Sequence, residues 1–270
     1  MTAQVDVDVH YTSLHDEKAR LSSTLRGRFE LARMQDLLGR YLPEPPADVA
    51  DIGGGPGVHA RWLRDRGYSV ELLDPVERHI QQATAAGITA VQGDARRLPW
   101  ENDHFDAALL AGPIYHLPEA ADRRLALREA IRVVRPGGFL AVVAINRAAN
   151  LIGSTLANTL LDRQRVVTEI LETGFSPDNE RMAQTVYHTT SQLRTELTNV
   201  GLRSVTLHGL TGPGGWLTVA IDRHFPEIEL PDTLTRHDPM LTALECSRLA
   251  DRHPELVPAS SLLFAVGQCV

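Results

Sequence analysis

The residues with the clearest chemical meaning lie in a glycine-rich turn that follows a short apolar run. Asp51 precedes the run Gly53-Gly54-Gly55-Pro56-Gly57, and such a turn lets a ligand approach the backbone closely. Asp74 follows Gly57 by seventeen residues and ends the next apolar run. A carboxylate there can accept hydrogen bonds from both hydroxyls of a ribose. The combination predicts a site for a cofactor that contains adenosine, although a glycine-rich turn alone can be purely structural.

Two details distinguish between the cofactors that contain adenosine. A dinucleotide-binding turn requires a third glycine where this chain has Val58, and the negative charge of Asp51 would repel a pyrophosphate. A nicotinamide dinucleotide is therefore the less favoured of these cofactors. A nicotinamide-dependent oxidoreductase on the same fold remains the alternative.

Four motifs in order resemble those of class I S-adenosylmethionine-dependent methyltransferases. The run Asp51–Gly57 resembles the first motif, and Gly93–Pro99 resembles the acidic turn after the third strand. Phe105–Leu110 resembles the fourth strand, and Val133–Leu140 resembles the turn into the fifth. The resemblance implies S-adenosylmethionine as the cofactor and S-adenosylhomocysteine as the product.

This resemblance covers roughly residues 48–145 and, more weakly, 185–207. It implies that the cofactor lies along the carboxyl ends of the strands, with Asp94 facing the adenine amino group and the end of the fourth strand meeting the methionine part. The expected cofactor-binding residues are Tyr11, Arg28, Asp51, Gly53, Gly54, Gly55, Gly57, Asp74, Pro75, Asp94, Ala95, Leu110 and Ala111.

Some of these assignments have structural alternatives. Asp94 could instead be a turn or helix-cap carboxylate. Tyr11 belongs to an N-terminal segment that, in related methyltransferases, folds across the cofactor. Arg20 or Arg28 could reach the methionine carboxylate, whereas most arginines on a helix are simply solvated.

Tyr115 and His116 are the residues expected at the acceptor site. Methyl transfer from a sulfonium is an in-line displacement, so alignment of the acceptor and exclusion of water matter most. Both residues follow the fourth strand at the edge where open α/β sheets bind ligands. If the acceptor is a hydroxyl, His116 could remove its proton; alternatively it only hydrogen-bonds the loop or packs beside the cofactor.

Departures from other methyltransferase patterns narrow the acceptor class. Ala111–Ile114 does not match the Asn/Asp-Pro-Pro-aromatic motif common in enzymes that methylate amino groups of nucleic acids and proteins. No carboxylate follows Leu110 until Glu119, so no metal is predicted. His188 and Trp216 are weaker candidates, because capping and core packing compete with a role in binding.

The elements that must position these residues alternate along the chain. Apolar runs at 48–52, 69–73, 89–92, 105–110 and 138–145 are separated mostly by helical stretches. This order predicts an α/β fold with a Rossmann-like, doubly wound, seven-stranded sheet and helical lid insertions. Further strands are expected at 204–207 and 261–266, with a helix at 191–200.

The remaining segments define the expected domain organisation. Residues 1–47 form an N-terminal helical segment over the cofactor site, as one helix or as two with a break near Gly27, and 48–147 form the cofactor-binding core. Residues 148–184 form a helical lid. Residues 185–270 complete the sheet and contain a second helical insertion at about 217–258.

Composition limits the partners. The net charge is −7, which disfavours nucleic acid. No apolar run reaches membrane-spanning length and no signal pattern occurs, so no membrane partner and a cytoplasmic location are expected. Cys246 and Cys269 are expected to be free thiols.

The motifs and these limits on partners lead us to expect a methyltransferase for a small molecule, such as a secondary metabolite. A protein that binds S-adenosylmethionine without catalysis remains an alternative, and the oligomeric state is open.

Overall fold

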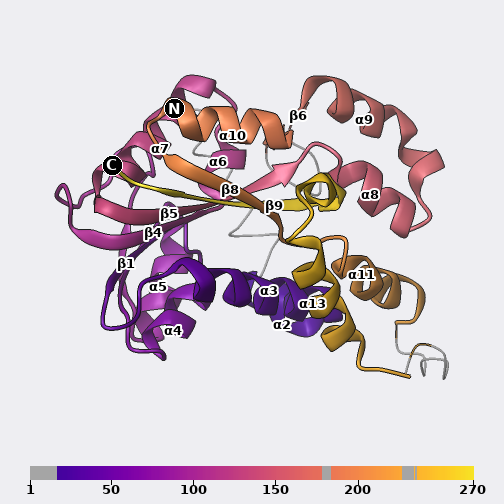
Figure 1. Ribbon diagram of the computed structural model, residues 1–270, viewed down its shortest axis with the longest axis horizontal. Helices are drawn as coiled ribbons and strands as arrows, with labels where there is room; N and C mark the ends of the chain where they lie inside the picture. Colours follow the sequence, from indigo (N-terminus) through magenta and orange to yellow (C-terminus); the bar gives the residue numbers. More distant parts are fainter. Residues whose placement is uncertain (1–16, 178–183, 227–233, 235) are drawn as a thin grey trace.

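The computed structural model describes residues 17–177, 184–226, 234 and 236–270, and in it helices cover both faces of a central sheet (Figure 1). The strands of the described part are β1 Asp48–Ile52, β2 Ser69–Asp74, β3 Thr89–Gln92, β4 Phe105–Ala111, β5 Val134–Asn146, β6 Phe175–Ser176, β7 Thr185–His188, β8 Arg203–Gly209 and β9 Leu262–Gln268. Parallel strands β3, β2, β1, β4 and β5 lie in that order, and β9 and then β8 follow β5, with β9 antiparallel to both. The predicted α/β, doubly wound fold is confirmed.

The sheet includes one short strand pair beyond the seven predicted strands. β6 and β7 pair antiparallel, and β7 also pairs with the end of β5 at Ile145 and Asn146. Ile145 pairs with Leu262 of β9 as well, so β7 lies on the other side of β5. The extra pair thus extends the carboxyl edge of the sheet toward the first insertion.

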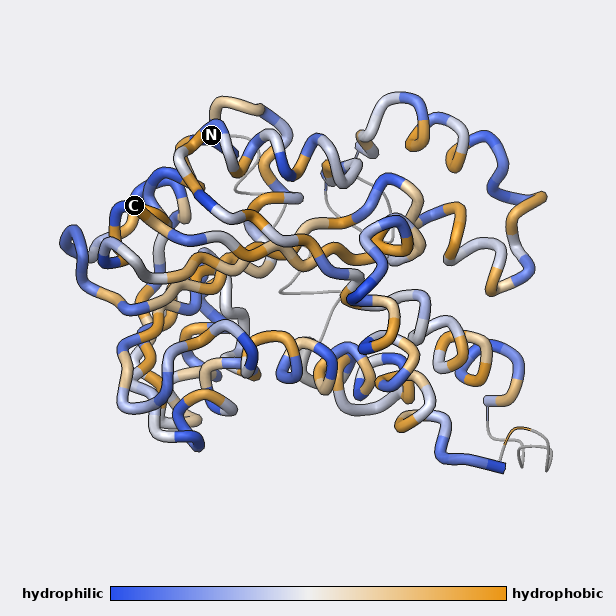
Figure 2. The backbone as a smooth tube through the Cα atoms, viewed as in Figure 1, coloured by the Kyte–Doolittle hydropathy of each residue, from blue (hydrophilic) through white to orange (hydrophobic). Residues whose placement is uncertain are grey.

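The hydrophobic core lies on both faces of the parallel strands. In Figure 2 the continuous hydrophobic segments in the middle of the view belong to these strands. One face packs against α3 Leu25–Tyr41, α4 Val58–Arg64 and α5 Glu77–Ala85, and the other against α7 Ala120–Arg132 and α10 Thr190–Asn199. Coverage on both faces explains why these strands are continuous apolar runs rather than alternating ones. Among the described helices, none combines the length and the apolar character needed to cross a membrane.

The N-terminal helical segment is divided into two helices, with the break at Thr24, near Gly27. α2 spans Glu17–Ser23 and α3 begins at Leu25, because Thr24 is extended and its side chain accepts a hydrogen bond from the Gly27 amide. A Cβ at Gly27 would lie 2.1 Å from the Arg20 carbonyl oxygen. The glycine therefore marks the close contact between the two helices, whereas the cap at Thr24 marks the break.

Two helical insertions follow strands of the sheet. The first contains α8 Ala149–Leu156 and α9 Leu160–Thr173, directly after β5. The second, between β8 and β9, contains α11 Gly215–His224, α13 Pro239–Ala250 and a 3-10 helix at Pro254–Ala259. Figure 1 shows α11 beside both α3 and α8, so the second insertion joins the N-terminal helices to the first insertion.

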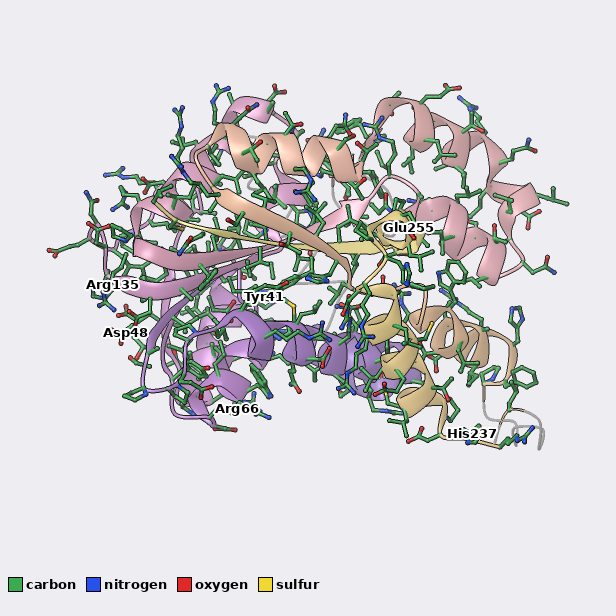
Figure 3. The ribbon with its side chains drawn as sticks, in the orientation of Figure 1. Tyr41, Asp48, Arg66, Arg135, His237 and Glu255 are labelled. Atoms are coloured by element: carbon green, nitrogen blue, oxygen red, sulfur yellow. The ribbon has the colours of Figure 1, made fainter. Side chains whose placement is uncertain are left out.

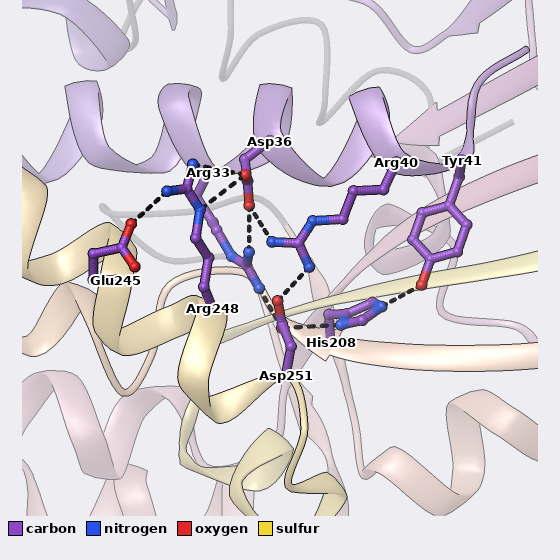
Figure 4. Close-up of polar contacts among 8 residues, drawn as sticks. All are labelled: Arg33, Asp36, Arg40, Tyr41, His208, Glu245, Arg248 and Asp251. Atoms are coloured by element: carbon purple, nitrogen blue, oxygen red, sulfur yellow. Dashed lines mark hydrogen bonds and ion pairs between the residues drawn. The ribbon is translucent and has the colours of Figure 1, made fainter.

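A network of charged side chains fixes α13 against α3 and β8 (Figure 4). Arg33 is fully buried and forms ion pairs with Asp36 and Asp251. Asp251 also pairs with Arg40 at 2.5 Å and with Nδ1 of His208 at 3.0 Å. These contacts hold the pKa of Asp251 far below its usual range in spite of its burial.

A second polar cluster lies at the amino ends of the strands. Arg135 pairs with Asp106 and, at 3.3 Å, with Asp48, and the two labelled members lie together at the left of Figure 3. Asp106 also accepts a hydrogen bond from the Asp48 amide. Ion pairs therefore lie at the amino ends of the strands, whereas a cavity lies at their carboxyl ends.

Candidate functional site

A cavity of about 1250 Å³ lies at the carboxyl ends of β1, β2, β4 and β5. The glycine-rich turn after β1, the loop after β4 and both helical insertions contribute to its walls. Its volume is above the usual range of small-molecule sites and is large enough for a cofactor beside a second ligand.

The glycine-rich turn packs directly against the loop after β4. Gly53 has φ +76°, and a Cβ there would lie 2.5 Å from the Pro113 ring. A Cβ at Gly54 would lie 2.5 Å from an Asp51 carboxylate oxygen. Glycine at these positions therefore lets the turn approach both the loop and the acidic side chain below it.

Asp51 is a fully buried carboxylate on the wall of the cavity. Neither of its oxygens has a hydrogen-bond partner of normal geometry among the described residues. Burial and the negative charge of Asp74 raise the pKa of Asp51 to about 7, and the Ala60 backbone amide is near enough to oppose this rise only in part. A carboxylate in this position would be stabilised by a cationic ligand.

Asp74, by contrast, has several hydrogen-bond donors. Its Oδ1 accepts from the Val76 amide at 3.0 Å and from Nδ1 of His79 at 2.9 Å, and its Oδ2 accepts from the Gly55 amide at 2.9 Å. His79, on the first turn of α5, is buried and lines the cavity. The sequence analysis did not predict His79 as a site residue. The only signal in the sequence is its position five residues after Asp74.

The acidic turn after β3 also reaches the cavity, through Asp94 and Ala95. The Asp94 carboxylate accepts hydrogen bonds from the backbone amide and guanidinium of Arg96, and these contacts lower its pKa despite partial burial. Asp94 therefore has the turn-stabilising role considered as its alternative, and it faces the cavity as well. Contact with adenine stays a prediction.

Several of the expected cofactor-binding residues are placed elsewhere. Leu110 is fully buried in the core, because its side chain faces away from the cavity, and Gly57 caps α4 beside Ala83. Arg28 is exposed on α3 and is not part of the cavity wall. Tyr11 lies outside the described residues.

Other residues of the same elements line the cavity instead. Arg20 and Glu30 are on the wall and form an ion pair at 2.7 Å. This ion pair keeps the pKa of Glu30 below its usual value although burial opposes it. Pro75 and Ala111 also line the cavity, as do Asp51, Gly53, Gly54, Gly55 and Asp74.

Tyr115 and His116 belong to the short helix α6 Pro113–His116 and both line the cavity. Their ring centroids are 4.7 Å apart, and His116 is buried whereas Tyr115 is half-buried. A Cβ at Gly112 would lie 3.8 Å from the Tyr115 hydroxyl, so this hydroxyl is directed back toward the end of β4. The ring of Tyr115 packs against the cluster that contains Tyr187.

Beyond Tyr115 the cavity continues as a mainly apolar space, which we call the insertion chamber. Its apolar walls come from both insertions and the ends of β8 and β9: Leu156, Val166, Ile170, Phe175, Leu210, Trp216, Val219 and Leu262. Asn150 and Arg163 add polar groups and are hydrogen-bonded to each other at 3.0 Å. Further polar groups on the walls come from Thr159, Glu169, Thr211 and Arg223. His188 is outside this chamber and pairs with Glu196 at 3.5 Å.

No set of three or more His, Cys, Asp or Glu side chains within the described ranges is arranged to hold a metal ion. The absence of a metal from the reaction remains a prediction from the sequence.

Comparison with known proteins places the core in one family. Residues 50–142 match the methyltransferase domain family. A ubiquinone/menaquinone biosynthesis C-methyltransferase of Azotobacter vinelandii is 28% identical over 190 residues, which are 61% of this chain and 69% of that protein. A demethylmenaquinone methyltransferase of Mycolicibacterium paratuberculosis is 32% identical over 119 residues, 44% of this chain and 50% of the relative.

The chain thus spans about half the length of the mycobacterial relative. The fold is also similar to a solved S-adenosylmethionine-dependent methyltransferase of Thermotoga maritima, described as a possible histamine N-methyltransferase. Its TM-score is 0.60 at 17% identity, and the alignment covers 99% of this chain and 100% of that one. The match to the family model over residues 50–142, together with the four motifs and their positions around the cavity, supports a class I S-adenosylmethionine-dependent methyltransferase, and the solved structure shows a likeness of fold over the whole chain.

Proposed function

We propose that the protein transfers the methyl group of S-adenosylmethionine to a small molecule bound in the insertion chamber. The observation that carries the proposal is the Asp51 carboxylate, which is fully buried on the cavity wall without a hydrogen-bond partner among the described residues. An uncompensated buried carboxylate is costly unless a cation joins it. The methionine part of the cofactor supplies an ammonium group.

The other residues of the cavity suit the same ligand. Asp74 offers an acceptor for the ribose and Asp94 one for adenine, and both lie along one wall with Asp51. The bound cofactor supplies an electrophilic methyl group on sulfur. Tyr115 and His116 line the same cavity, with the Tyr115 hydroxyl near Gly112 and its ring against the cluster of Ile170. There they would orient the acceptor and keep water from the methyl group.

The lining of the insertion chamber supports an acceptor that is largely apolar. Ile170, Phe175 and Trp216 offer hydrophobic surface, and the indole nitrogen of Trp216 is already engaged with the Ala259 carbonyl at 3.0 Å. Both curated relatives are named for quinone methylation. Reduced quinones and other apolar ring compounds are therefore the first acceptors to test.

The proposal is tested first at the cofactor, by calorimetric titration with S-adenosylmethionine, S-adenosylhomocysteine and NAD. We expect micromolar binding of the two adenosyl ligands and no binding of NAD. The variant Asp51→Asn keeps the shape of the side chain and removes its charge, so it should weaken the adenosyl ligands at least 10-fold. Preferential binding of NAD would favour an oxidoreductase and overturn the proposal.

Catalysis is tested next, by incubation with cofactor carrying a labelled methyl group and a panel of apolar ring compounds. Transfer of the label to an acceptor, with release of S-adenosylhomocysteine, is the expected result. Tight cofactor binding with no transfer to any acceptor would favour the non-catalytic alternative.

A further inference from the structure

We propose that the acceptor is an apolar ring compound with a carboxylate, and that Tyr187 and Arg163 bind this carboxylate in the insertion chamber. The inference deepens the proposed function and rests on it, because it names the class of molecule that the chamber accepts beside the cofactor. It assigns a role to two polar side chains that none of the four motifs contains.

The first step is a cluster of polar side chains in a chamber with mainly apolar walls. Arg163, on α9, donates from Nη2 to Oδ1 of Asn150 and from Nη1 to Oγ of Ser154, both at 3.0 Å. Asn150 and Ser154 are on α8, and Ser154 is 1% exposed. Because a guanidinium is planar, two contacts of this kind fix its orientation. Arg163 is therefore held in place on the cavity wall.

The second step is the hydroxyl of Tyr187, which is in β7 and lines the same cavity. Its ring is 6% exposed and packs in the apolar cluster of Ile170. Burial raises the pKa of Tyr187, and Asn150 and Arg163 are near enough to its hydroxyl to oppose this rise in part. The hydroxyl is thus protonated at neutral pH and can donate a hydrogen bond. Among the residues that the structure describes, none accepts its hydrogen.

The third step is the charge that a ligand meets in the chamber. Arg163 is half-buried, whereas Glu169 and Arg223, which are also on the walls, are exposed. Water and salt screen exposed charges more than partly buried ones, so the guanidinium acts most strongly on a bound ligand. A guanidinium and a tyrosine hydroxyl both donate, and an ionised carboxylate only accepts. The cluster therefore fits a carboxylate better than an amide or an ammonium group.

The fourth step is the place of the cluster relative to the expected acceptor residues. Tyr115 packs against the apolar cluster that contains Tyr187 and Ile170, and Phe175 lines the same cavity. A few polar groups in a largely apolar pocket fix the orientation of a ligand. A carboxylate bound at Tyr187 and Arg163 would therefore select which ring atom of the acceptor faces the methyl group.

The experiment measures direct binding to the protein saturated with S-adenosylhomocysteine. Calorimetric titrations use benzoate, 2-naphthoate and biphenyl-4-carboxylate, each compared with its carboxamide, which keeps the shape and removes the charge. We expect at least one acid to bind roughly 10- to 100-fold more tightly than its carboxamide, because a hydrogen bond to a charged group is the stronger one. Equal affinity for acid and carboxamide, or binding of no acid, would overturn the inference.

Variants at both positions then assign the carboxylate to its partners. Tyr187→Phe removes the hydroxyl and keeps the ring, so the ratio of acid to carboxamide affinity should fall about 3-fold or more. Arg163→Gln removes the charge and should bring the ratio close to one, whereas Arg163→Lys keeps the charge and should retain part of the ratio. Arg165→Gln is the matched control, at an exposed arginine of α9 away from the cavity wall, and should keep the ratio of the natural protein.

The outcomes separate this inference from the proposed function. If Arg163→Gln weakens acid and carboxamide by the same factor, the guanidinium only joins α9 to α8 and the inference fails. Thermal unfolding establishes that each variant is folded, and Tyr187→Phe decides the question if Arg163→Gln is not. The proposed function fails instead if the natural protein binds no S-adenosylhomocysteine, a result that does not depend on the ratio between acid and carboxamide.

Discussion

The negative charge of Asp74 acts on Asp51, which lies near the end of the neighbouring strand, and together with burial it raises the pKa of Asp51 to about 7. The two carboxylates differ in their surroundings, because Asp74 has three hydrogen-bond donors and Asp51 has no partner among the described residues. This contrast leads to two predictions on pH.

Affinity for S-adenosylhomocysteine should rise between pH 5.5 and 7.5. The ammonium of the ligand requires an ionised Asp51, whose pKa without ligand is about 7, so affinity should increase by up to about 10-fold per pH unit below 7 and then level off. Calorimetry across this range measures it. Asp51→Asn is the control and should bind weakly with a much flatter profile; an equally steep profile in the variant would assign the titration to another group.

The same carboxylate should destabilise the ligand-free protein at alkaline pH. Its pKa is raised from 3.8 to about 7 on folding, so its stabilising contribution is fully present below pH 3.8 and is lost as the pH rises through 7. At pH 8 Asp51→Asn should therefore increase the free energy of unfolding by roughly 1–4 kcal/mol. Urea denaturation at pH 8 and pH 5 checks this, and a gain that is equal at both values would contradict it.

Gly54→Ala should abolish or strongly weaken cofactor binding. The new Cβ would lie 2.5 Å from an Asp51 oxygen and 2.6 Å from a Leu72 methyl group, so the turn must shift. Gly39→Ala is the matched control, because its Cβ meets nothing within 4 Å on the exposed side of α3. It should bind normally and gain about 0.5–1 kcal/mol of stability. Normal affinity in Gly54→Ala would mean that the turn does not need its close approach to Asp51.

Arg33→Met should lower the free energy of unfolding by roughly 2–5 kcal/mol, because it leaves Asp36 and Asp251 short of a buried partner. Arg33 has no exposed side-chain surface, whereas Arg248, which also pairs with Asp36, is 44% exposed. Arg248→Met should therefore cost no more than about 1 kcal/mol. Urea denaturation of both variants measures the difference, and equal losses would show that burial of the network is not decisive.

His116→Gln should leave the affinity for S-adenosylhomocysteine within about 2-fold and lower kcat by about 100-fold or more if the acceptor loses a proton to His116. The kcat of the variant and of the natural protein is measured with an acceptor identified among the apolar ring compounds. An unchanged kcat would assign His116 to packing beside Tyr115, with which it is in ring contact.

The amino-acid sequence by itself determined the core of the fold and predicted the class of cofactor. Alternating apolar runs and helical stretches are local signals, and so are the glycines of residues 53–57 and the acidic residues at the ends of β1, β2 and β3. Because carboxyl ends of parallel strands meet at one edge of a sheet, their positions in the chain were sufficient to group Asp51, Asp74 and Asp94.

Tertiary structure decided which side chains face the cavity. Leu110 and Ala111 are neighbours in β4, yet only Ala111 lines the cavity, because successive residues of a strand point to opposite faces. Arg28 is exposed while Glu30 lines the cavity, since the packing of α2 at Gly27 sets the rotation of α3. Such rotations depend on contacts between segments far apart in the chain, which motif and periodicity cannot report.

The same reason explains His79 and the insertion chamber. The bond between His79 and Asp74 depends on how α5 sits against β2, and the chamber forms only where α8 and α9 meet α11 and the end of β9. Local sequence indicated that helices are inserted after β5 and before β9. Only their packing against the sheet and against each other created an apolar space beside Tyr115 and His116, because burial of apolar surface is a property of the assembled elements and not of any one of them.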